Sequence, residues 1–251
     1  MFKQKIAQIL ENYNFCSKRA SSSFLKNNKV FVNEERILDL SKKIDTDEEK
    51  IFINGKTLKK TKNIYILFNK PLGVVCSAVS DSHKTVFDFI KNRHKNKKNC
   101  APLHIAGRLD SLTSGLVLLT TNGAFSHFVT VPETHLKKIY KIELEEKVSL
   151  EKQKKYILEC KKGIFLAAEK KDSEYFTKSA DLVFNSENIC TLCIKEGRFH
   201  QVRRMMSALG LTIKTLKRIS IGPFSLDDLK IKEGKYKIFS QKEIKRIFNK
   251  V

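Results

Sequence analysis

The sequence contains no apolar run that approaches the roughly 18 residues required for a membrane-spanning helix. Its first stretch, MFKQKIAQILENYNF, mixes polar and apolar side chains, so we expect neither a secretory signal nor a membrane anchor there. The six cysteines have no framework spacing, and without an export signal they are expected to be reduced thiols. We therefore expect a cytoplasmic protein with no membrane partner.

The sequence also has few candidates for metal ligands. Cys190 and Cys193 have the spacing of half a zinc site, but no second pair of cysteines or histidines with similar spacing accompanies them. The surrounding ICTLCI is typical of a strand, which directs two residues three apart to opposite faces. We expect core or surface thiols here, and no metal site.

Acidic residues are scarce. The 27 Asp and Glu residues stand against 49 Lys and Arg, which gives a formal net charge of +22. A chain with such an excess most often meets a polyanion, so nucleic acid is the favoured partner and an anionic membrane surface a distant second. A lysine bias inherited from an AT-rich genome would explain why so many basic residues are lysine. It would not explain the shortage of acidic ones.

The first 57 residues behave as a unit. Apolar residues at helical spacing predict a helix in FKQKIAQILENYN, and Ser17 is a candidate N-cap for a second helix through Leu25. Two strand-like segments follow, KVFVNEERI and DEEKIFING. The second helix and its exit carry Lys18, Arg19, Lys26 and Lys29, which make either a basic binding surface or an ordinary solvated face.

After the lysine-rich linker GKTLKKTKN the composition changes, and strands outnumber helices. Most strands lie near hairpin-like turns, which predicts an α+β domain on a mixed, largely antiparallel sheet. The expected strands lie within residues 64–77, 115–123, 135–148, 181–197, 216–226 and 234–240, and the expected helices within 84–90, 124–132, 200–211 and 242–248.

One carboxylate stands out in HIAGRLDSLTSGLVLLTTNG, residues 104–123. Asp110 has an ordinary interpretation, a turn residue whose side chain accepts hydrogen bonds from the backbone that follows. Arg108 nearby and the bracketing Gly107 and Gly115 favour a functional loop that another backbone can approach. The sequence offers no competing Ser-His-Asp order, phosphate-binding loop, paired carboxylates or histidine-rich cluster.

A second candidate stretch, KEGRFHQVRRMMSALG, is expected to form an amphipathic helix with Arg198, Arg203 and Arg204 at its start. Cations are unfavourable at a helix N-terminus, so this arrangement suggests a docked RNA phosphate or a catalytic carboxylate. His200 is expected to be a hydrogen-bonded structural residue.

A third candidate is Tyr140, in the alternating segment LKKIYKIEL. A half-buried tyrosine of a sheet is the commoner outcome for this pattern. An aromatic platform for a nucleobase is the alternative.

These three stretches resemble, in order and separation, the sequence motifs of the RsuA-type rRNA pseudouridine synthases. FNKPLGVVCSAVSDSHKTVFDFI and SHFVTVP look more like the small-subunit rRNA enzymes of that family than their large-subunit relatives. The resemblance covers residues 62–251, so a catalytic domain is expected over 61–251. Residues 1–60 more loosely resemble a small RNA-binding module of the alpha-L type, shared with a ribosomal small-subunit protein.

The resemblance implies roles for matching positions. Asp110 would act at the sugar of the target uridine, and Arg108 would hold the flipped nucleotide or fill its vacated place. Tyr140 would pack against the flipped base and assist proton removal. Arg203, or alternatively Arg198, would hold the Asp110 carboxylate ionised through a bidentate pair. Further RNA contacts would come from the basic residues Lys18, Arg19 and Arg198.

The resemblance also implies a function: isomerisation of one uridine of small-subunit 16S rRNA, uridine 516 in the family's usual numbering. No cofactor is expected, and the partner would be this rRNA or the assembling small subunit, met by a monomer. Two alternatives are an enzyme for large-subunit 23S rRNA and a non-catalytic rRNA-binding assembly protein. Asp110 favours an enzyme, because a protein that only binds could lose it freely.

Overall fold

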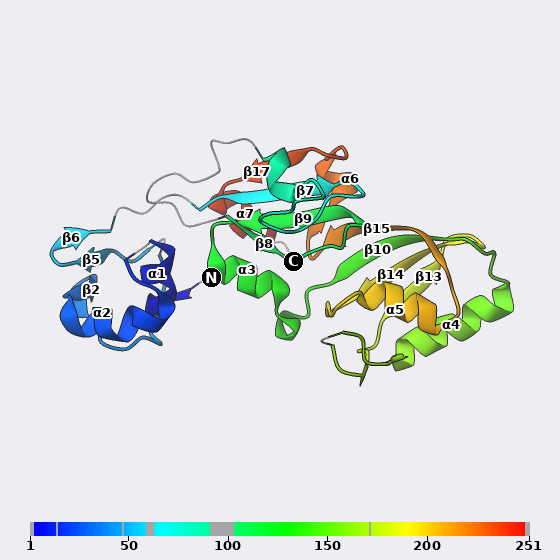
Figure 1. Ribbon diagram of the computed structural model, residues 1–251, viewed down its shortest axis with the longest axis horizontal. Coiled ribbons are helices and arrows are strands. Elements are labelled where there is room, and N and C mark those ends of the chain that lie inside the picture. The colour runs from blue at the N-terminus through cyan, green and yellow to red at the C-terminus, as the bar shows by residue number, and fades with distance from the viewer. Residues whose placement is uncertain are drawn as a thin grey trace.

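The computed structural model describes residues 3–13, 15–46, 48–58, 63–90, 103–170 and 172–248. Its two parts share no apolar core: one cluster is built from residues 6–58, and two others lie in the remainder of the described chain. Figure 1 shows the smaller part at one end of the long axis and the larger sheet filling the rest. The predicted division at about residue 60 agrees with these cores and stays a prediction as a boundary between functional units.

The N-terminal part packs two short helices on a small sheet of order β3-β2-β5-β6, beside a β1–β4 pair. The expected helix from Ser17 is divided. Ser17 accepts a hydrogen bond from the Ala20 amide and caps a 3₁₀ turn, after which a separate helix begins. The elements are β1 (Gln4–Lys5), α1 (Ile6–Asn12), η1 (Lys18–Ala20), α2 (Ser21–Asn27), β2 (Val30–Val32), β3 (Glu35–Arg36), β4 (Lys43–Ile44), β5 (Ile51–Ile53) and β6 (Lys56–Thr57).

The larger part is built on a nine-stranded sheet of order β13-β14-β10-β15-β9-β7-β17, with β16 beside β15 and β8 beside β9. All its strand pairs are antiparallel except β9 with β15, so the predicted α+β class and mixed, largely antiparallel sheet are confirmed. The strands are β7 (Tyr65–Lys70), β8 (His104–Ala106), β9 (Ser114–Thr120), β10 (Lys138–Leu144), β13 (Asp181–Phe184), β14 (Ile189–Ile194), β15 (Ile213–Ile221), β16 (Phe224–Ser225) and β17 (Tyr236–Phe239).

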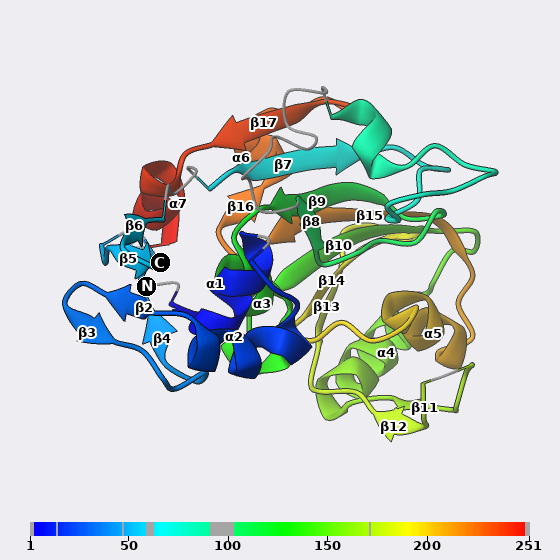
Figure 2. The same cartoon turned by 60° about the vertical axis from the view of Figure 1, so that its left-hand side comes forward.

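Helices cover both faces of this sheet. One face carries η2, α4 and α5, and the other α3, α6 and α7. Figure 2 shows α4 and α5 grouped with a small hairpin beside β13 and β14. The elements that cover the sheet are η2 (Val86–Phe89), α3 (Gly123–Thr130), η4 (Pro132–Thr134), α4 (Leu150–Lys162), α5 (Gln201–Ala208), α6 (Leu226–Leu229) and α7 (Gln241–Phe248), with the hairpin β11 (Phe165–Leu166) and β12 (Tyr175–Phe176).

Several expectations can be compared with these elements. The lysine-rich segment expected to follow η2 falls at residues 91–102, which lie outside the described residues. Cys190 is buried on one face of β14, and Cys193 is half-buried on the other face. The described residues contain no cluster of three metal-ligating side chains. In the same part of the chain, no helix is long and apolar enough to cross a bilayer.

The parallel junction between β9 and β15 depends on a glycine. Gly115 pairs with Arg218 in register and has φ +107°, a backbone conformation that favours glycine. A Cβ at this position would lie 2.2 Å from the Arg218 carbonyl oxygen and 2.7 Å from its nitrogen. The two strands can therefore approach this closely only because no side chain stands between them.

Replacing Gly115 by alanine should lower the free energy of unfolding by about 3 kcal/mol, because β9 and β15 must separate locally to admit the methyl group. Gly210→Ala is the matched control, since Gly210 has φ +72° but open space around it. It should cost about 1–2 kcal/mol, the conformational term alone. Urea denaturation followed by circular dichroism measures both, and equal losses would contradict the steric explanation.

Candidate active site

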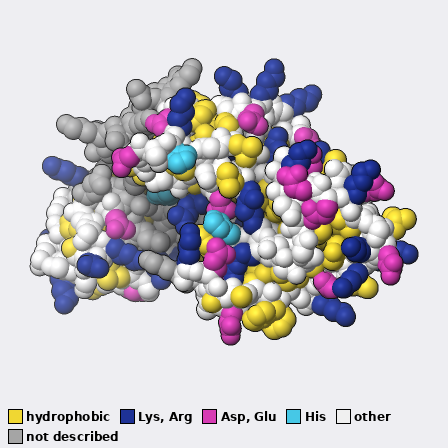
Figure 3. All heavy atoms as spheres, turned by 45° about the vertical axis from the view of Figure 1, so that its right-hand side comes forward, with side chains coloured by type: hydrophobic (Ala, Val, Ile, Leu, Met, Phe, Trp, Pro, Cys, Tyr) yellow, Lys and Arg dark blue, Asp and Glu magenta, His cyan; other side chains and the backbone are white. Residues whose placement is uncertain are grey.

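A cavity of about 680 Å³ opens where loops after β8 and β14 meet the middle of the sheet. Asp110, Arg108, Tyr140, Arg198 and Arg203 all line it, as do several residues that sequence reasoning left out. In the space-filling view, Lys and Arg side chains protrude over both parts of the chain (Figure 3). Lys18 and Arg19 are exposed on the N-terminal part and do not line this cavity. The left-out residues include Lys138, Phe199, Gln201 and Arg218. His200, expected to be a hydrogen-bonded structural residue, lines the cavity too.

Asp110 sits on a turn between β8 and β9. Its backbone carbonyl accepts the Thr113 amide at 3.1 Å, whereas its side chain makes no hydrogen bond to the turn among the described residues. The carboxylate instead faces His200, with 3.5 Å between Oδ1 and Nε2, and it is half-exposed. The turn is therefore closed by the backbone, and the carboxylate remains available to a bound ligand.

Arg218 is the central buried residue beneath this turn, with only 2% of its surface exposed. Its Nη2 donates to the Gly107 carbonyl and its Nε to the Leu116 carbonyl, each at 2.8 Å. Longer contacts of 3.5 Å reach the Tyr140 hydroxyl and the Arg108 carbonyl. One guanidinium thus joins the Asp110 turn, β9 and Tyr140.

The bidentate pair expected between Arg203 and Asp110 is not formed. Arg203 donates instead to the Leu112 carbonyl, and its buried Nε has no partner among the described residues. The alternative, Arg198, is bound to Asp172 with 2.9 Å between Nε and Oδ1 and stacks on Tyr175 at 3.6 Å. The reason lies in the backbone before α5, where His200 adopts φ +48° and presents its imidazole to Asp110.

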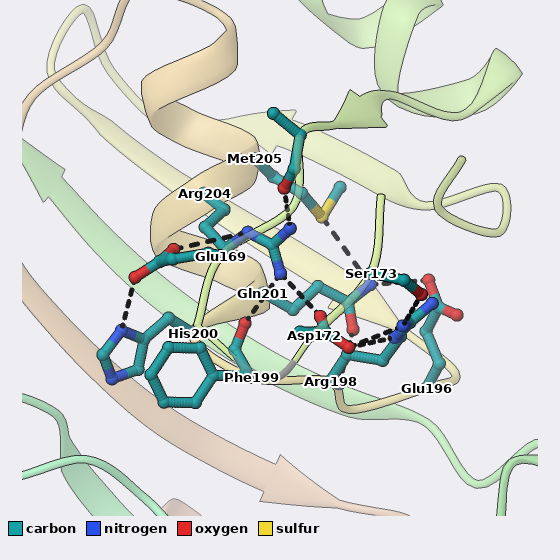
Figure 4. Close-up of polar contacts among 11 residues, drawn as sticks. Glu169, Asp172, Ser173, Glu196, Arg198, Phe199, His200, Gln201, Arg204 and Met205 are labelled. Atoms are coloured by element: carbon teal, nitrogen blue, oxygen red, sulfur yellow. Dashed lines mark hydrogen bonds and ion pairs between the residues drawn. The ribbon is translucent and has the colours of Figure 1, made fainter. Parts of the chain in front are cut away.

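Two of the three arginines at the start of α5, Arg198 and Arg204, are paired with acidic side chains (Figure 4). Arg204 contacts Asp172 at 2.7 Å and Glu169 at 3.5 Å, and both acids come from the β11–β12 hairpin. Burial alone would raise the pKa of Asp172, but hydrogen bonds from Arg204 and Arg198 lower it. The sequence pattern predicts that an RNA phosphate or a catalytic carboxylate offsets the positive charge at this helix N-terminus. The carboxylates of Asp172 and Glu169 offset it instead.

Tyr140 and the buried Lys70 lie in the same region as Asp110. Tyr140 is 7% exposed on β10, so it is buried rather than half-buried, and it lines the cavity. Lys70 is fully buried and donates to the carbonyls of Val74 at 2.7 Å and Pro71 at 3.1 Å. Burial lowers the pKa of Lys70 to about 8, and the nearby Asp110 charge opposes that shift.

Sequence reasoning missed Arg218, although a signal was present. The segment LKRISIG was recognised as a strand, and alternation places Arg218 on the same side as buried Leu216. A buried arginine on the inward face of a strand needs several acceptors, so its position alone indicates a structural or catalytic role.

Arg218→Lys should lower the free energy of unfolding by about 2 kcal/mol or more, because an ammonium cannot reach the Gly107 and Leu116 carbonyls together. Arg203→Lys is the control and should cost less than about 1 kcal/mol, since Arg203 satisfies a single carbonyl. Urea denaturation measures both variants. A larger loss for Arg203→Lys would show that the central role given to Arg218 is wrong.

The chain is similar to known proteins over most of its length. Residues 64–208 match the family model described as RNA pseudouridylate synthase. The "Ribosomal small subunit pseudouridine synthase A" of Haemophilus influenzae is 34% identical over 95% of this chain and 97% of its own length. The protein of the same name from Escherichia coli strain K12 is 33% identical over 88% of this chain and 89% of its own.

The fold agrees as well. A solved structure titled "Crystal structure of pseudouridylate synthase" matches with a TM-score of 0.65 and 33% identity. That match covers 97% of this chain and 99% of the other. The fold, the motifs and the relatives lead to one conclusion: this chain is an enzyme of the RNA pseudouridylate synthase family.

Proposed function

We propose that this enzyme converts one uridine of small-subunit 16S rRNA to pseudouridine, and that the target is uridine 516 in the family's usual numbering. The observation that carries the proposal is the half-exposed Asp110 carboxylate at a cavity whose floor holds Tyr140 and Arg218. The names of the H. influenzae and E. coli relatives support the small subunit as the source of the substrate.

The reaction needs the target nucleotide out of its stack, and a cavity of about 680 Å³ is large enough for a nucleobase and its ribose. Asp110 would then either attack C1′ of the ribose or remove its 2′ proton as the bond from N1 to C1′ breaks. The base rotates and C5 bonds to C1′, which in the first case breaks the bond between Asp110 and C1′ and in the second is accompanied by return of the proton to C2′. C5 then releases its proton, and N1 takes one up, so that both alternatives regenerate the Asp110 carboxylate. The product is an isomer with no net oxidation, so this chemistry requires no cofactor.

The other side chains divide between positioning and binding. Tyr140 would pack against the base, and Arg218 would act as a positioning residue through the Gly107 and Arg108 carbonyls that precede Asp110. Arg108 is exposed at the rim, where it can contact a phosphate or the space left by the flipped base. Arg203 lines the same cavity and has no ion pair with Asp110 among the described residues, which suits it to the substrate more than to Asp110.

The basic N-terminal part would supply affinity. Lys18 and Arg19 lie exposed on η1, where they can reach an RNA backbone. We propose that the enzyme works in the cytoplasm as a monomer without a bound metal, on this rRNA or on the assembling small subunit. Action on large-subunit 23S rRNA and non-catalytic binding are kept as outcomes of the tests below.

Asp110→Asn should abolish isomerisation in cells and in vitro, with a fall in the single-turnover rate of about 10⁴-fold or more. The test deletes the gene, maps pseudouridines in both rRNAs by carbodiimide labelling and primer extension, and restores wild type, Asp110→Asn or the exposed control Asp228→Asn. A stop that disappears from 16S rRNA should return with wild type and the control only.

Each other result has one meaning. A stop lost from 23S rRNA instead would overturn the substrate and keep the chemistry. A map unchanged by deletion would favour the binding protein. Return of the primer-extension stop with Asp110→Asn would show that the Asp110 carboxylate is not required for the reaction.

Lys18→Ala combined with Arg19→Ala should weaken rRNA binding and reduce the slope of log Kd against log salt by about 1 to 2, because two phosphate contacts are lost. The rate at saturating RNA should stay unchanged, since neither residue lines the cavity. Lys152→Ala with Lys154→Ala removes the same charge from exposed sites on α4 and serves as the control. Equal slopes for both double variants would mean that η1 has no special contact with RNA.

A further inference from the structure

Lys138 is a buried lysine that ends in the catalytic cavity. It is 5% exposed and lies on β10 two residues before Tyr140, so both side chains are on the inward face of the strand. Its cross-strand neighbours are Ile194 on β14 and Ile221 on β15, which are apolar and buried. The strand therefore places a cationic side chain between apolar neighbours and at the edge of the cavity.

The amine of Lys138 is poorly satisfied. Its one hydrogen bond runs to the Leu136 carbonyl at 3.5 Å, and no ion pair of Lys138 occurs among the described residues. Lys70, the comparable buried lysine, has two carbonyl acceptors and does not line the cavity. Lys138 thus keeps donors free where a ligand would bind.

The charges around Lys138 make this arrangement unfavourable without a ligand. Burial, together with the Arg218 charge, lowers its pKa to about 8, and the Glu196 charge opposes the shift. Glu196 is itself held by the Lys178 amide at 2.9 Å and by the Gln201 side chain. A buried ammonium with one weak acceptor costs stability, so the protein gains from it only when an anion or carbonyl arrives.

The proposed reaction produces such a group. When the bond from N1 to C1′ breaks, both electrons remain on the base, and the negative charge spreads over N1 and the two carbonyl oxygens. We infer that Lys138 is a catalytic residue whose ammonium donates a hydrogen bond to a carbonyl oxygen of the flipped uracil and stabilises the negative charge of the detached base. This inference rests on the proposed function. It identifies Lys138 as the residue that binds the detached uracil, which is the leaving group.

The chemistry of the amine also restricts the ligand. An ammonium only donates, so it pairs with a carbonyl oxygen and not with an amino group. Because its charge is aimed at negative charge that develops only as the bond breaks, it should contribute more to the rate than to RNA affinity.

Lys138→Met tests the inference, because methionine matches the stem and removes the charge. The single-turnover rate on 16S rRNA should fall about 100-fold, as when one donor to a developing anion is lost. The Kd for RNA should change by less than about threefold. The thermal midpoint should stay equal or rise, since replacing a buried charge by an apolar group is often stabilising. A lysine with a structural role would instead lower the midpoint.

Two further variants complete the set. Lys138→Arg should keep part of the rate, and its activity should persist at alkaline pH where the wild-type rate falls as Lys138 loses its proton above about 8. Arg218 and Glu196 are the charged groups acting on Lys138, and both are unchanged in this comparison. Lys141→Met removes the same charge from the exposed face of β10 and should retain the wild-type rate.

Atom substitution in the substrate gives a test independent of folding. Sulfur accepts hydrogen bonds more weakly than oxygen, so 2-thiouridine or 4-thiouridine at the target should slow the wild type. The substitution at the contacted position should add little to the slow rate of Lys138→Met. Additive losses at both positions, or a Lys138→Met rate within about threefold of wild type, overturn the inference. A wild type that isomerises neither rRNA defeats the proposed function instead.

Discussion

The buried guanidinium of Arg218 is the contact on which the catalytic cavity depends. It lies at the parallel junction of the sheet, and its donors reach carbonyls on both sides of the Asp110 turn. Without those acceptors the charge could not remain buried, and without the charge the Gly107 and Leu116 carbonyls would be unsatisfied. The position of the Asp110 carboxylate is therefore a consequence of satisfying one arginine inside a β-sheet.

Two acidic residues near the cavity are also paired with arginines. Acidic residues are few, and two of them, Glu169 and Asp172, are used to hold Arg198 and Arg204 at the start of α5. Asp110 has only the imidazole of His200 within ion-pair distance among the described residues. A strongly basic chain thus keeps one carboxylate accessible, since Arg198 and Arg204 are bound to other acids and Arg203 donates to a backbone carbonyl.

The strands and the reactive loop were predictable, because alternation and turn residues are local signals. The hairpin around NSEN and the approach of Asp110 and Tyr140 to one cavity agree with the sequence predictions. The contacts of Arg198 and Arg204 were not predictable, since they depend on acids from a hairpin about 30 residues earlier. The contact of Arg203 with the Leu112 carbonyl was not predictable either, because it joins residues 91 positions apart. Helix α4 was not predicted either, because Cys160 is its one buried residue and its pattern is weak.

The junction of β9 with β15 also orders events in time. Arg218 and Leu116 are 102 residues apart in the chain, so the contact cannot form until most of the polypeptide has left the ribosome. A nascent chain that already displays Asp110 still lacks the strand that fixes its loop. The cavity beside Asp110 is thus among the last features to be completed during synthesis, and an unfinished chain lacks it.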